Sequence, residues 1–361
     1  MSDTIDPVEL RDAVRPVLTD LRADSWRIPG EDGRGFDTAL WQQCAELGWL
    51  QLAVPEAQGG LGLGLAHLAI LYEELGRALG SVPFLDTMLA VEAITAGNAG
   101  KSGEEILGAI SAGECRAAIA LPQVHEVLES DGKHLSGRVD NVLFGDNADI
   151  VLLPFVEAGK RALAIIPGDV DGLTRSKRNL VDLTRSAADL TADEIDIAKC
   201  TVLSLDNGAW ASLLDHAAVG IACDATGAAE ADFEITLEYL KTREQFGRLI
   251  GSFQALKHRA ADWKCRFETA SALTRQAARL TSQDKGASAS ASGAKAVACD
   301  MFAGLSADAI QLHGGIGFTW EHPCHLFLKR AKLNQQLFGD RIFHQERLAE
   351  LAFGPVLQAA E

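Results

Sequence analysis

Two short runs in the second half of the chain decide the fold. The first is TREQFG at residues 242–247, followed by IGSFQ at residues 250–254, and the second is QLHGGIGFT at residues 311–319. The glycine that closes TREQFG ends one predicted helix, and IGSFQ opens the next. In the second run, Gly314 and Gly315 leave the backbone open to close approach by a ligand. The pattern therefore predicts that each run contains a loop next to a helix.

The first run lies in a basic part of an acidic chain. Residues 241–279 hold nine basic and three acidic side chains, whereas the whole chain has a net charge of -17. This cluster is suited to phosphate, but a solvated helix face with ion pairs four residues apart has the same composition. The overall charge repels nucleic acid and anionic membranes, so neither is an expected partner.

Composition places the chain among ordinary globular proteins. It has 361 residues, of which 47% are hydrophobic and 23% charged, and this length predicts two or three domains. The seven cysteines are scattered singly without a CxxC pair, which favours reduced thiols. The N-terminus lacks the apolar segment of a leader, and no apolar stretch of ~18 residues follows. We expect no membrane insertion and a cytoplasmic location.

Hydrophobic periodicity divides the chain into three segments. Residues 1–112 and 207–361 show the helical repeat, and residues 113–206 show short runs typical of strands. The predicted fold is α+β and mainly α, with an N-terminal helical domain, a middle β domain and a C-terminal helical bundle. Residues 283–293, rich in Ser, Gly and Ala, are predicted to link two bundle helices. The predicted strands are Ala117–Leu121, Leu135–Val142, Ile150–Pro154, Ala162–Ile166 and Ala198–Leu205.

Together the two runs closely resemble the C-terminal domain of the acyl-CoA dehydrogenase family. VPEAQGGLG at residues 54–62 and ELGR at residues 74–77 resemble its N-terminal domain. That family combines an N-terminal helical domain, a middle β domain and a C-terminal four-helix bundle, the same order as the three segments. Two motifs in the expected order are far more specific than either motif alone.

The resemblance implies FAD as the cofactor. In the family FAD lies at a dimer interface, and the bundle of one subunit holds the adenosine diphosphate half of its neighbour's flavin. Arginine supplies the permanently charged fork that pyrophosphate needs. By motif position, Arg243 contacts pyrophosphate, Gln245 and Phe246 the adenosine side, Phe253 and Gln254 the ribityl region, and Gln311, Gly314 and Gly315 form the partnering loop.

The positions of the family's catalytic base are changed in this chain. Dehydrogenation of an acyl thioester needs a carboxylate to remove the α proton and a flavin to accept the β hydride. The position of the usual Glu holds Phe338, and the alternative position on the helix before Arg243 holds Ala217. Asp340, two positions from Phe338, is a weak candidate for the base.

The strands that contact the flavin ring in the family are changed as well. The first reads AIALPQ at residues 118–123, without the family's hydroxyl and acid, and the second, at residues 139–142, lacks its Trp and Thr. Residues that serve a neighbour's FAD are therefore kept, while those that serve the chain's own FAD are lost. This asymmetry predicts a partner.

The leading hypothesis is the subunit without the base of a heteromeric acyl-CoA dehydrogenase. The chain resembles the short subunits of α2β2 enzymes of actinobacterial sterol side-chain catabolism. That resemblance implies an acyl-CoA substrate with a steroid-like chain, a longer homologue as partner and electron transfer flavoprotein as acceptor. Two alternatives remain open: a self-sufficient homomer that uses Asp340 or another acid, and a non-catalytic scaffold subunit.

HPCH at residues 322–325 superficially suggests a metal ligand set. No acidic or second cysteine ligand lies nearby in the sequence, so a loop is favoured and no metal site is predicted. For His313, within the second run, packing is favoured over catalysis.

Overall fold

The computed structural model describes residues 5–23, 36–280, 284 and 286–358. The chain folds into two compact units. The bundle unit comprises Met1–Trp26, Ala69–Gly80 and Ala218–Glu361, and the sheet unit comprises Arg27–Leu68 and Ser81–Ala217. The units are not continuous in sequence. The segment Ala69–Gly80, which includes most of α3 (Leu65–Arg77), belongs to the bundle unit although its neighbours on both sides belong to the sheet unit.

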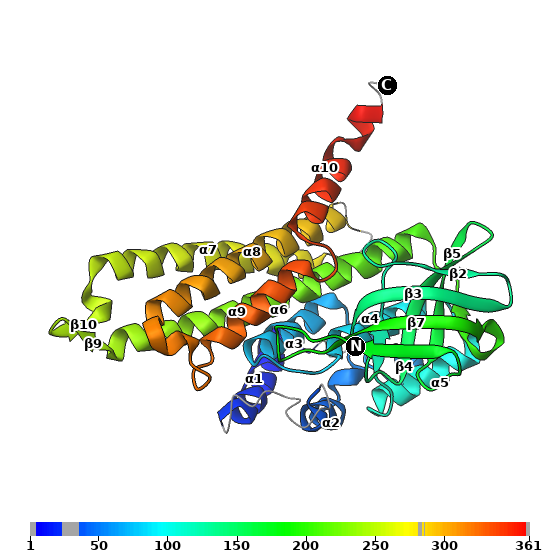
Figure 1. The fold of residues 1–361 in the computed structure, drawn as a ribbon, viewed down its shortest axis with the longest axis horizontal. Coiled ribbons are helices and arrows are strands. Elements are labelled where there is room, and N and C mark those ends of the chain that lie inside the picture. The colour runs from blue at the N-terminus through cyan, green and yellow to red at the C-terminus, as the bar shows by residue number, and fades with distance from the viewer. Residues whose placement is uncertain (1–4, 24–35, 281–283, 285, 359–361) are drawn as a thin grey trace. The chain divides into compact units, whose positions relative to one another are not determined.

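Four of the helices of the bundle unit, α6, α7, α8 and α9, lie side by side, and α10 points away from them (Figure 1). Helix α8 packs against α7, α9 and α10. The first half of α7 leaves its apolar face partly open, because the buried side chains of this helix begin only at Phe267. The long helices are α6 (Asn207–Thr242), α7 (Gln254–Arg279), α8 (Ala287–His313), α9 (Cys324–Gln336) and α10 (Arg341–Gln358), and α1 (Pro7–Ala23) joins them.

Helices α3 and α6 cross with their backbones in contact. A Cβ atom added to Gly76 would collide with the backbone of Asp224, and one added to Gly227 would collide with the backbone of Glu73. Glycine is therefore required on both helices, because any side chain would force them apart.

A buried charge fixes the same crossing. The Arg330 side chain on α9 is fully buried, and its Nη1 donates to Asp224 Oδ2 at 2.9 Å. Its Nη2 donates to the Gly80 carbonyl oxygen at 3.2 Å, and Asn334 Nδ2 donates to Asp224 Oδ1 at 2.7 Å. The hydrogen bonds compensate both buried charges and tie α6, α9 and the end of α3 together.

An eight-stranded sheet forms the centre of the sheet unit. The strand order is β6-β7-β3-β2-β4-β5-β8, and β1 pairs with β4. Strands β1 and β2 run parallel to β4, and the other pairs are antiparallel. The strands are β1 (Ala117–Ile119), β2 (Leu128–Ser130), β3 (His134–Leu143), β4 (Ile150–Glu157), β5 (Lys160–Pro167), β6 (Leu173–Lys177), β7 (Ala187–Asp196) and β8 (Thr201–Leu203).

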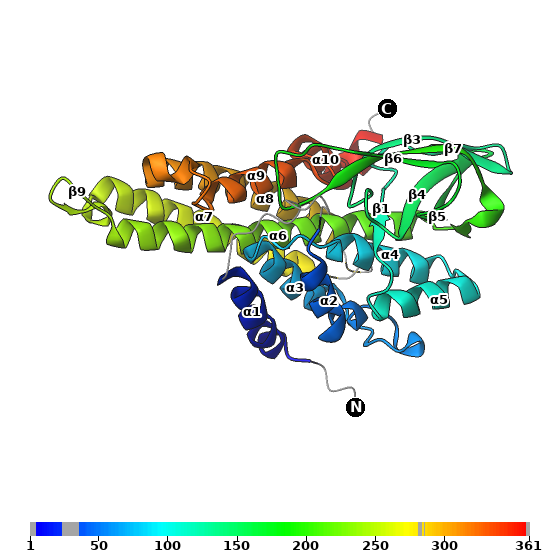
Figure 2. The same ribbon diagram turned by 60° about the horizontal axis from the view of Figure 1, so that its bottom comes forward.

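Among the described residues, the helices that lie wholly in the sheet unit are α2, α4 and α5. Helix α4 packs on β1, and α5 packs on α4 (Figure 2). The burial of alternate strand residues, among them Val139, Val151 and Leu190, builds the core beneath the sheet. The helices are α2 (Thr38–Glu46), α4 (Phe84–Ala96) and α5 (Gly100–Ser111).

The predicted fold class, α+β and mainly α, is confirmed. All five predicted strand regions contain a strand, although the last starts only at Thr201, after a 3-10 turn. Strands β2, β6 and β7 were not predicted. The predicted linker at residues 283–293 is wrong over most of its length, because α8 begins at Ala287, and Gln283 lies outside the described residues. The boundaries at 112 and 206 stay predictions.

Among the described residues, no helix has both the length and the apolar character needed to cross a membrane.

Candidate functional site

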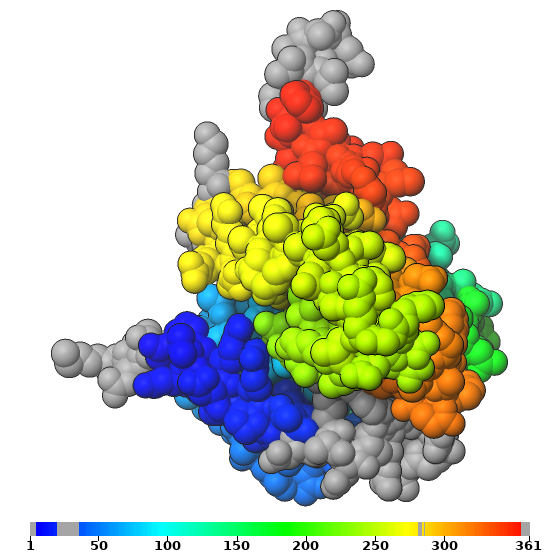
Figure 3. Space-filling model, turned by 90° about the vertical axis from the view of Figure 1, so that its left-hand side faces the viewer, coloured from blue at the N-terminus to red at the C-terminus, as the bar shows by residue number. Residues whose placement is uncertain are grey.

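The two predicted loops lie at the same end of the bundle unit. The Tyr239 ring, near the end of α6, stacks on the His313 ring at the end of α8, with centroids 4.5 Å apart. Trp263 Nε1 on α7 donates to Asp308 Oδ2 on α8 at 2.8 Å. Figure 3 views this end, with the yellow-green atoms of the first loop and the start of α7 next to the orange atoms that follow α8. The fold therefore brings the two motifs together.

A small hairpin presents the first motif. Strands β9 (Glu244–Gln245) and β10 (Arg248–Leu249) pair across Phe246 and Gly247, which have φ angles of 56° and 75°. The left-handed conformation costs a residue other than glycine about 1–2 kcal/mol. Phe246 is nevertheless 90% exposed. A strained and exposed aromatic residue is typical of a position kept for binding.

Unengaged polar side chains surround the hairpin. Arg243, Gln254 and Gln311 are exposed, and in the part of the chain that the structure describes no hydrogen bond or ion pair of their side chains is seen. Gln245 Nε2 donates to the neighbouring Glu244 carbonyl oxygen at 2.7 Å. Phe253 packs edge-to-face on Phe246, with ring centroids 6.2 Å apart, and Arg248 lies over its ring at 3.9 Å. The side-chain donors of Arg243, Gln254 and Gln311 and the exposed Phe246 ring are available to a ligand.

The glycine pair of the second motif leaves an open cradle. Gly314 begins the 3-10 turn η5 (Gly314–Phe318) with φ 62° and ψ -141°. A Cβ atom added to Gly314 or Gly315 would meet no atom within 4 Å. A permanent cation, amide donors, accessible backbone and two aromatic rings fit a nucleotide diphosphate. The residues present therefore fit the adenosine diphosphate half of FAD.

Large apolar side chains are exposed around the same loops. We call this set the end patch: Phe246 (90% exposed), Phe318 (74%), Trp320 (70%), Ile316 (45%) and Leu249 (40%). Large apolar side chains exposed together on neighbouring loops are typical of an interface. The end patch therefore adds the expectation of a protein partner beside the nucleotide donors.

The predicted base positions are buried and apolar. Phe338 is 4% exposed, and Ala217 is fully buried. Asp340 is the N-terminal cap of α10, since the Phe343 backbone N–H donates to its Oδ1 at 2.8 Å. A cap is a structural use of this carboxylate, because it satisfies a donor that the helix leaves unpaired.

The strand segments predicted to lack flavin contacts have structural roles in the sheet unit. Residues 118–121 are buried apolar side chains. Gln123 Nε2 donates to the Trp210 carbonyl oxygen at 2.8 Å. In the second segment, Asp140 pairs with Arg138 and Arg178, which both also pair with Asp189. Both segments therefore contribute to the packing and the ion pairs of the sheet unit.

A carboxylate that the sequence did not reveal lies near Ala217. His216 Nδ1 lies 2.6 Å from Glu92 Oε2, and Ser212 Oγ donates to Glu92 Oε1 at 2.6 Å. Burial acts to raise the pKa of Glu92, but the hydrogen bonds from His216 and Ser212 outweigh it and lower the pKa. A carboxylate stabilised in this way is a poor proton acceptor. No signal was available in the sequence, because α4 and α6 are more than a hundred residues apart.

Comparisons with known proteins agree with this geometry. The profile of the acyl-CoA dehydrogenase N-terminal domain matches residues 6–114, and that of the C-terminal domain matches residues 208–352. The acyl-CoA dehydrogenase IpdE2 of Mycobacterium tuberculosis is 35% identical over 340 residues, which cover 92% of this chain and 93% of that protein.

Two solved structures share the fold over nearly the whole chain. A variant of the Tcur3481-Tcur3483 steroid ACAD has a TM-score of 0.85 and 28% identity, and the match covers 97% of this chain and 98% of that one. The ChsE4-ChsE5 complex from M. tuberculosis has a TM-score of 0.84 and 24% identity, with coverage of 97% and 98%. The chain belongs to the acyl-CoA dehydrogenase family. Members of this family are FAD-binding oxidoreductases.

Proposed function

We propose that this chain is the subunit without the base of a heteromeric acyl-CoA dehydrogenase. It holds the adenosine diphosphate half of an FAD whose ring is held by a longer homologous subunit, and that subunit supplies the base. One observation carries the proposal. Exposed nucleotide-type donors and the end patch share one end of the bundle unit, whereas Phe338 and Ala217 are buried apolar residues.

Each residue of the site has a role in this proposal. Bound FAD supplies the acceptor for the hydride that leaves Cβ of the acyl chain. Arg243 neutralises the pyrophosphate, and the Gly314 and Gly315 backbone lets it approach closely. Phe246 shields the adenosine side from water, and Phe253 and Gln254 contact the ribityl region. The α proton is removed by a carboxylate of the partner.

The proposed substrate is an acyl-CoA thioester with a bulky, steroid-like chain. Support comes from the steroid ACAD, which is 28% identical to this chain over nearly its full length. The ChsE4-ChsE5 structure, a complex, has the same fold. Electron transfer flavoprotein is the proposed acceptor of the electrons.

We expect the chain to assemble as α2β2 with the longer homologue encoded beside it, with one FAD per heterodimer. The end patch would otherwise expose large apolar surface to water. Native mass spectrometry of the chain alone and of the mixture measures this. Phe246→Asp with Phe318→Asp should prevent assembly, while Phe353→Asp, at an exposed position on α10 outside the end patch, should not.

Two outcomes of this experiment would contradict the proposal. A homo-oligomer that ignores the neighbour, carries one FAD per chain and oxidises an acyl-CoA would refute the split site. A chain that takes up no flavin with any partner would instead support the scaffold alternative.

Asp340→Asn should leave turnover of the reconstituted enzyme within about tenfold of wild type, since a true general base contributes ~10²–10⁴. Asparagine caps helices about as well as aspartate, so the start of α10 should be preserved. The measurement is steady-state oxidation of an acyl-CoA with the flavin content checked. A loss of three decades with flavin still bound would identify Asp340 as the base and favour the homomeric alternative.

A further inference from the structure

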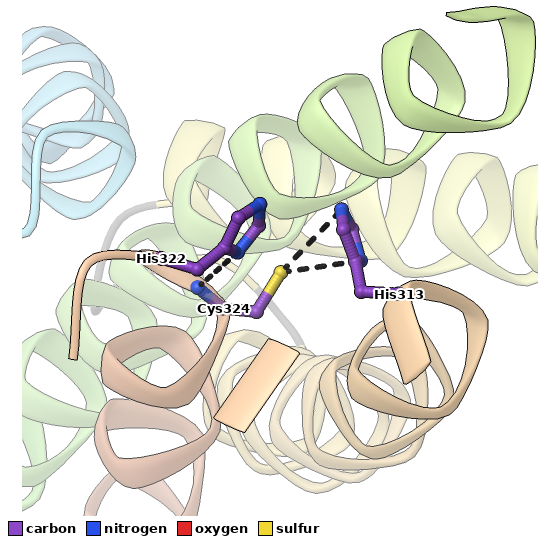
Figure 4. Close-up of side chains that lie close together, drawn as sticks. All are labelled: His313, His322 and Cys324. Atoms are coloured by element: carbon purple, nitrogen blue, oxygen red, sulfur yellow. Dashed lines mark hydrogen bonds between the residues drawn. The ribbon is translucent and has the colours of Figure 1, made fainter. Parts of the chain in front are cut away.

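Three side chains with metal-binding atoms meet inside the bundle unit. His313 ends α8, His322 lies in the loop after η5, and Cys324 begins α9 (Figure 4). One ligand atom from each residue lies within 4.8 Å of the other two. His313 and Cys324 are buried, and His322 is half-buried. No part of the proposed FAD chemistry uses this cluster.

The spacing of the ligand atoms fits a shared ion. Cys324 Sγ lies 3.4 Å from His313 Nδ1 and 3.9 Å from His313 Nε2. Zinc binds sulfur at ~2.3 Å and imidazole nitrogen at ~2.0–2.1 Å, so a tetrahedral ion places the two ligand atoms about 3.5 Å apart. The separation from Sγ to Nε2, at 3.9 Å, is slightly longer than that value, so the ring and the thiol must move closer together to share an ion.

The hydrogen bonds of His313 select its ligand atom. Nδ1 lies 2.8 Å from the Ala309 carbonyl oxygen and therefore donates its proton there. Nε2 is then the atom that carries a lone pair. Metal-ligating histidines usually donate their other N–H to a carbonyl or carboxylate in this way. Stacking on Tyr239 also fixes the plane of the ring.

His322 and Asp232 complete the surroundings. The Cys324 backbone N–H donates to His322 Nδ1 over 3.4 Å, a long bond that keeps the ring beside the thiol. The Asp232 side chain on α6 is fully buried, and its carboxylate lies close enough to the Cys324 thiol to raise the pKa of that thiol, after burial itself. A carboxylate and a thiolate in one buried site favour a divalent cation, which neutralises both.

We propose that His313, His322 and Cys324 form a structural zinc site, and that the nearby buried Asp232 carboxylate turns toward the ion to become the fourth donor when it binds. Thiolate, imidazole and carboxylate are all ligand types that zinc binds, and four of them give its tetrahedral coordination. Binding releases the Cys324 proton, because the thiolate is the ligand. The sequence predicted no metal here because it offered only HPCH, whereas the fold adds His313 and the acidic Asp232 from other helices.

The ion would stabilise the loop that carries the glycine cradle. His313 directly precedes Gly314, and His322 and Cys324 close the loop at its other end. An ion bound at both ends fixes the course of residues 314–321 between them. The zinc site is thus distinct from the nucleotide site and adjacent to it in the chain.

The experiment is a titration of the full-length chain, freed of metal by a chelator, with Co²⁺ as a spectroscopic probe and then with Zn²⁺. We expect one Co²⁺ per chain, a thiolate-to-cobalt charge-transfer band, and its loss when Zn²⁺ displaces the cobalt. Loss of an outer-shell partner typically costs about 10- to 100-fold in metal affinity, so Cys324→Ser, which removes a ligand, should cost more. Cys265→Ser removes an exposed cysteine elsewhere and should change nothing.

Circular dichroism of each metal-free variant checks folding. If Cys324→Ser does not fold, His322→Gln tests the site through a half-buried ligand and should weaken binding while keeping the charge-transfer band. Absence of the band in the folded wild-type chain would refute the proposal. A band that persists in Cys324→Ser, or uptake equal in both His322→Gln and wild type, would also refute it.

Discussion

Arg330→Met is expected to lower the free energy of unfolding by about 3–5 kcal/mol, because it leaves a buried charge without its partner. The Arg330 side chain is 0% exposed, and its removal strands the Asp224 carboxylate and the Gly80 carbonyl oxygen. Methionine keeps most of the apolar volume, so the effect reports the lost charge rather than a cavity. Denaturant unfolding, followed by circular dichroism, measures it.

A matched control uses an exposed ion pair of the same bundle unit. Arg341 Nη1 lies 3.3 Å from Asp300 Oδ2, and both side chains are more than half exposed. Exposed pairs contribute about 0–1 kcal/mol, so Arg341→Met should have little effect. Adding Asp224→Leu to Arg330→Met should recover part of the loss, because the stranded charge is removed. Equal effects at Arg330 and Arg341 would contradict the role assigned to burial.

Arg243→Ala should weaken retention of FAD by the heteromeric complex about 10- to 150-fold, which corresponds to ~1.5–3 kcal/mol for a hydrogen bond to a charged group. The reason is loss of the fork that pairs with pyrophosphate. The measurement is the ratio of flavin to protein after gel filtration at a series of protein concentrations.

Arg279→Ala is the control for net charge. Arg279 is exposed at the far end of α7, about 38 Å of helix from the start that lies next to the hairpin. It should leave FAD retention unchanged. Equal retention in Arg243→Ala and wild type would show that Arg243 only faces solvent, whereas equal losses in both variants would indicate a general charge effect.

Helical periodicity predicted most of the bundle helices. The start of α8 was missed because its small residues show no apolar periodicity. Ala-rich and Ser-rich sequence at the start of α8 was interpreted as a linker, yet Ala291 and Ser292 are buried there. Small side chains allow close helix packing as readily as they allow flexibility. In β7, alternation of Ala and Leu with acids gave too weak an apolar signal for a strand, although Ala188, Leu190 and Ala192 are buried.

The candidate site was predictable as residue types but not as contacts. The two motifs pointed to Arg243 and to the pair Gly314 and Gly315 as candidate site residues. The stacking of Tyr239 on His313 brings the two motifs together. The cap formed by Asp340 depends on where α10 begins, and counting from a motif does not give that position. The Glu92 pair with His216 depends on the packing of two distant helices, which no local pattern encodes.

The crossing of α3 and α6 has a consequence for cutting the chain. Residues 69–80 belong to the bundle unit although the residues on both sides belong to the sheet unit. A fragment that starts at Asn207 would lack the Glu73 backbone that packs against Gly227. In the same fragment, Arg330 would lose its hydrogen bond to the Gly80 carbonyl oxygen. Such a fragment would need residues 69–80 as a separate peptide. We therefore expect the C-terminal helices to fold stably only when residues 69–80 are present.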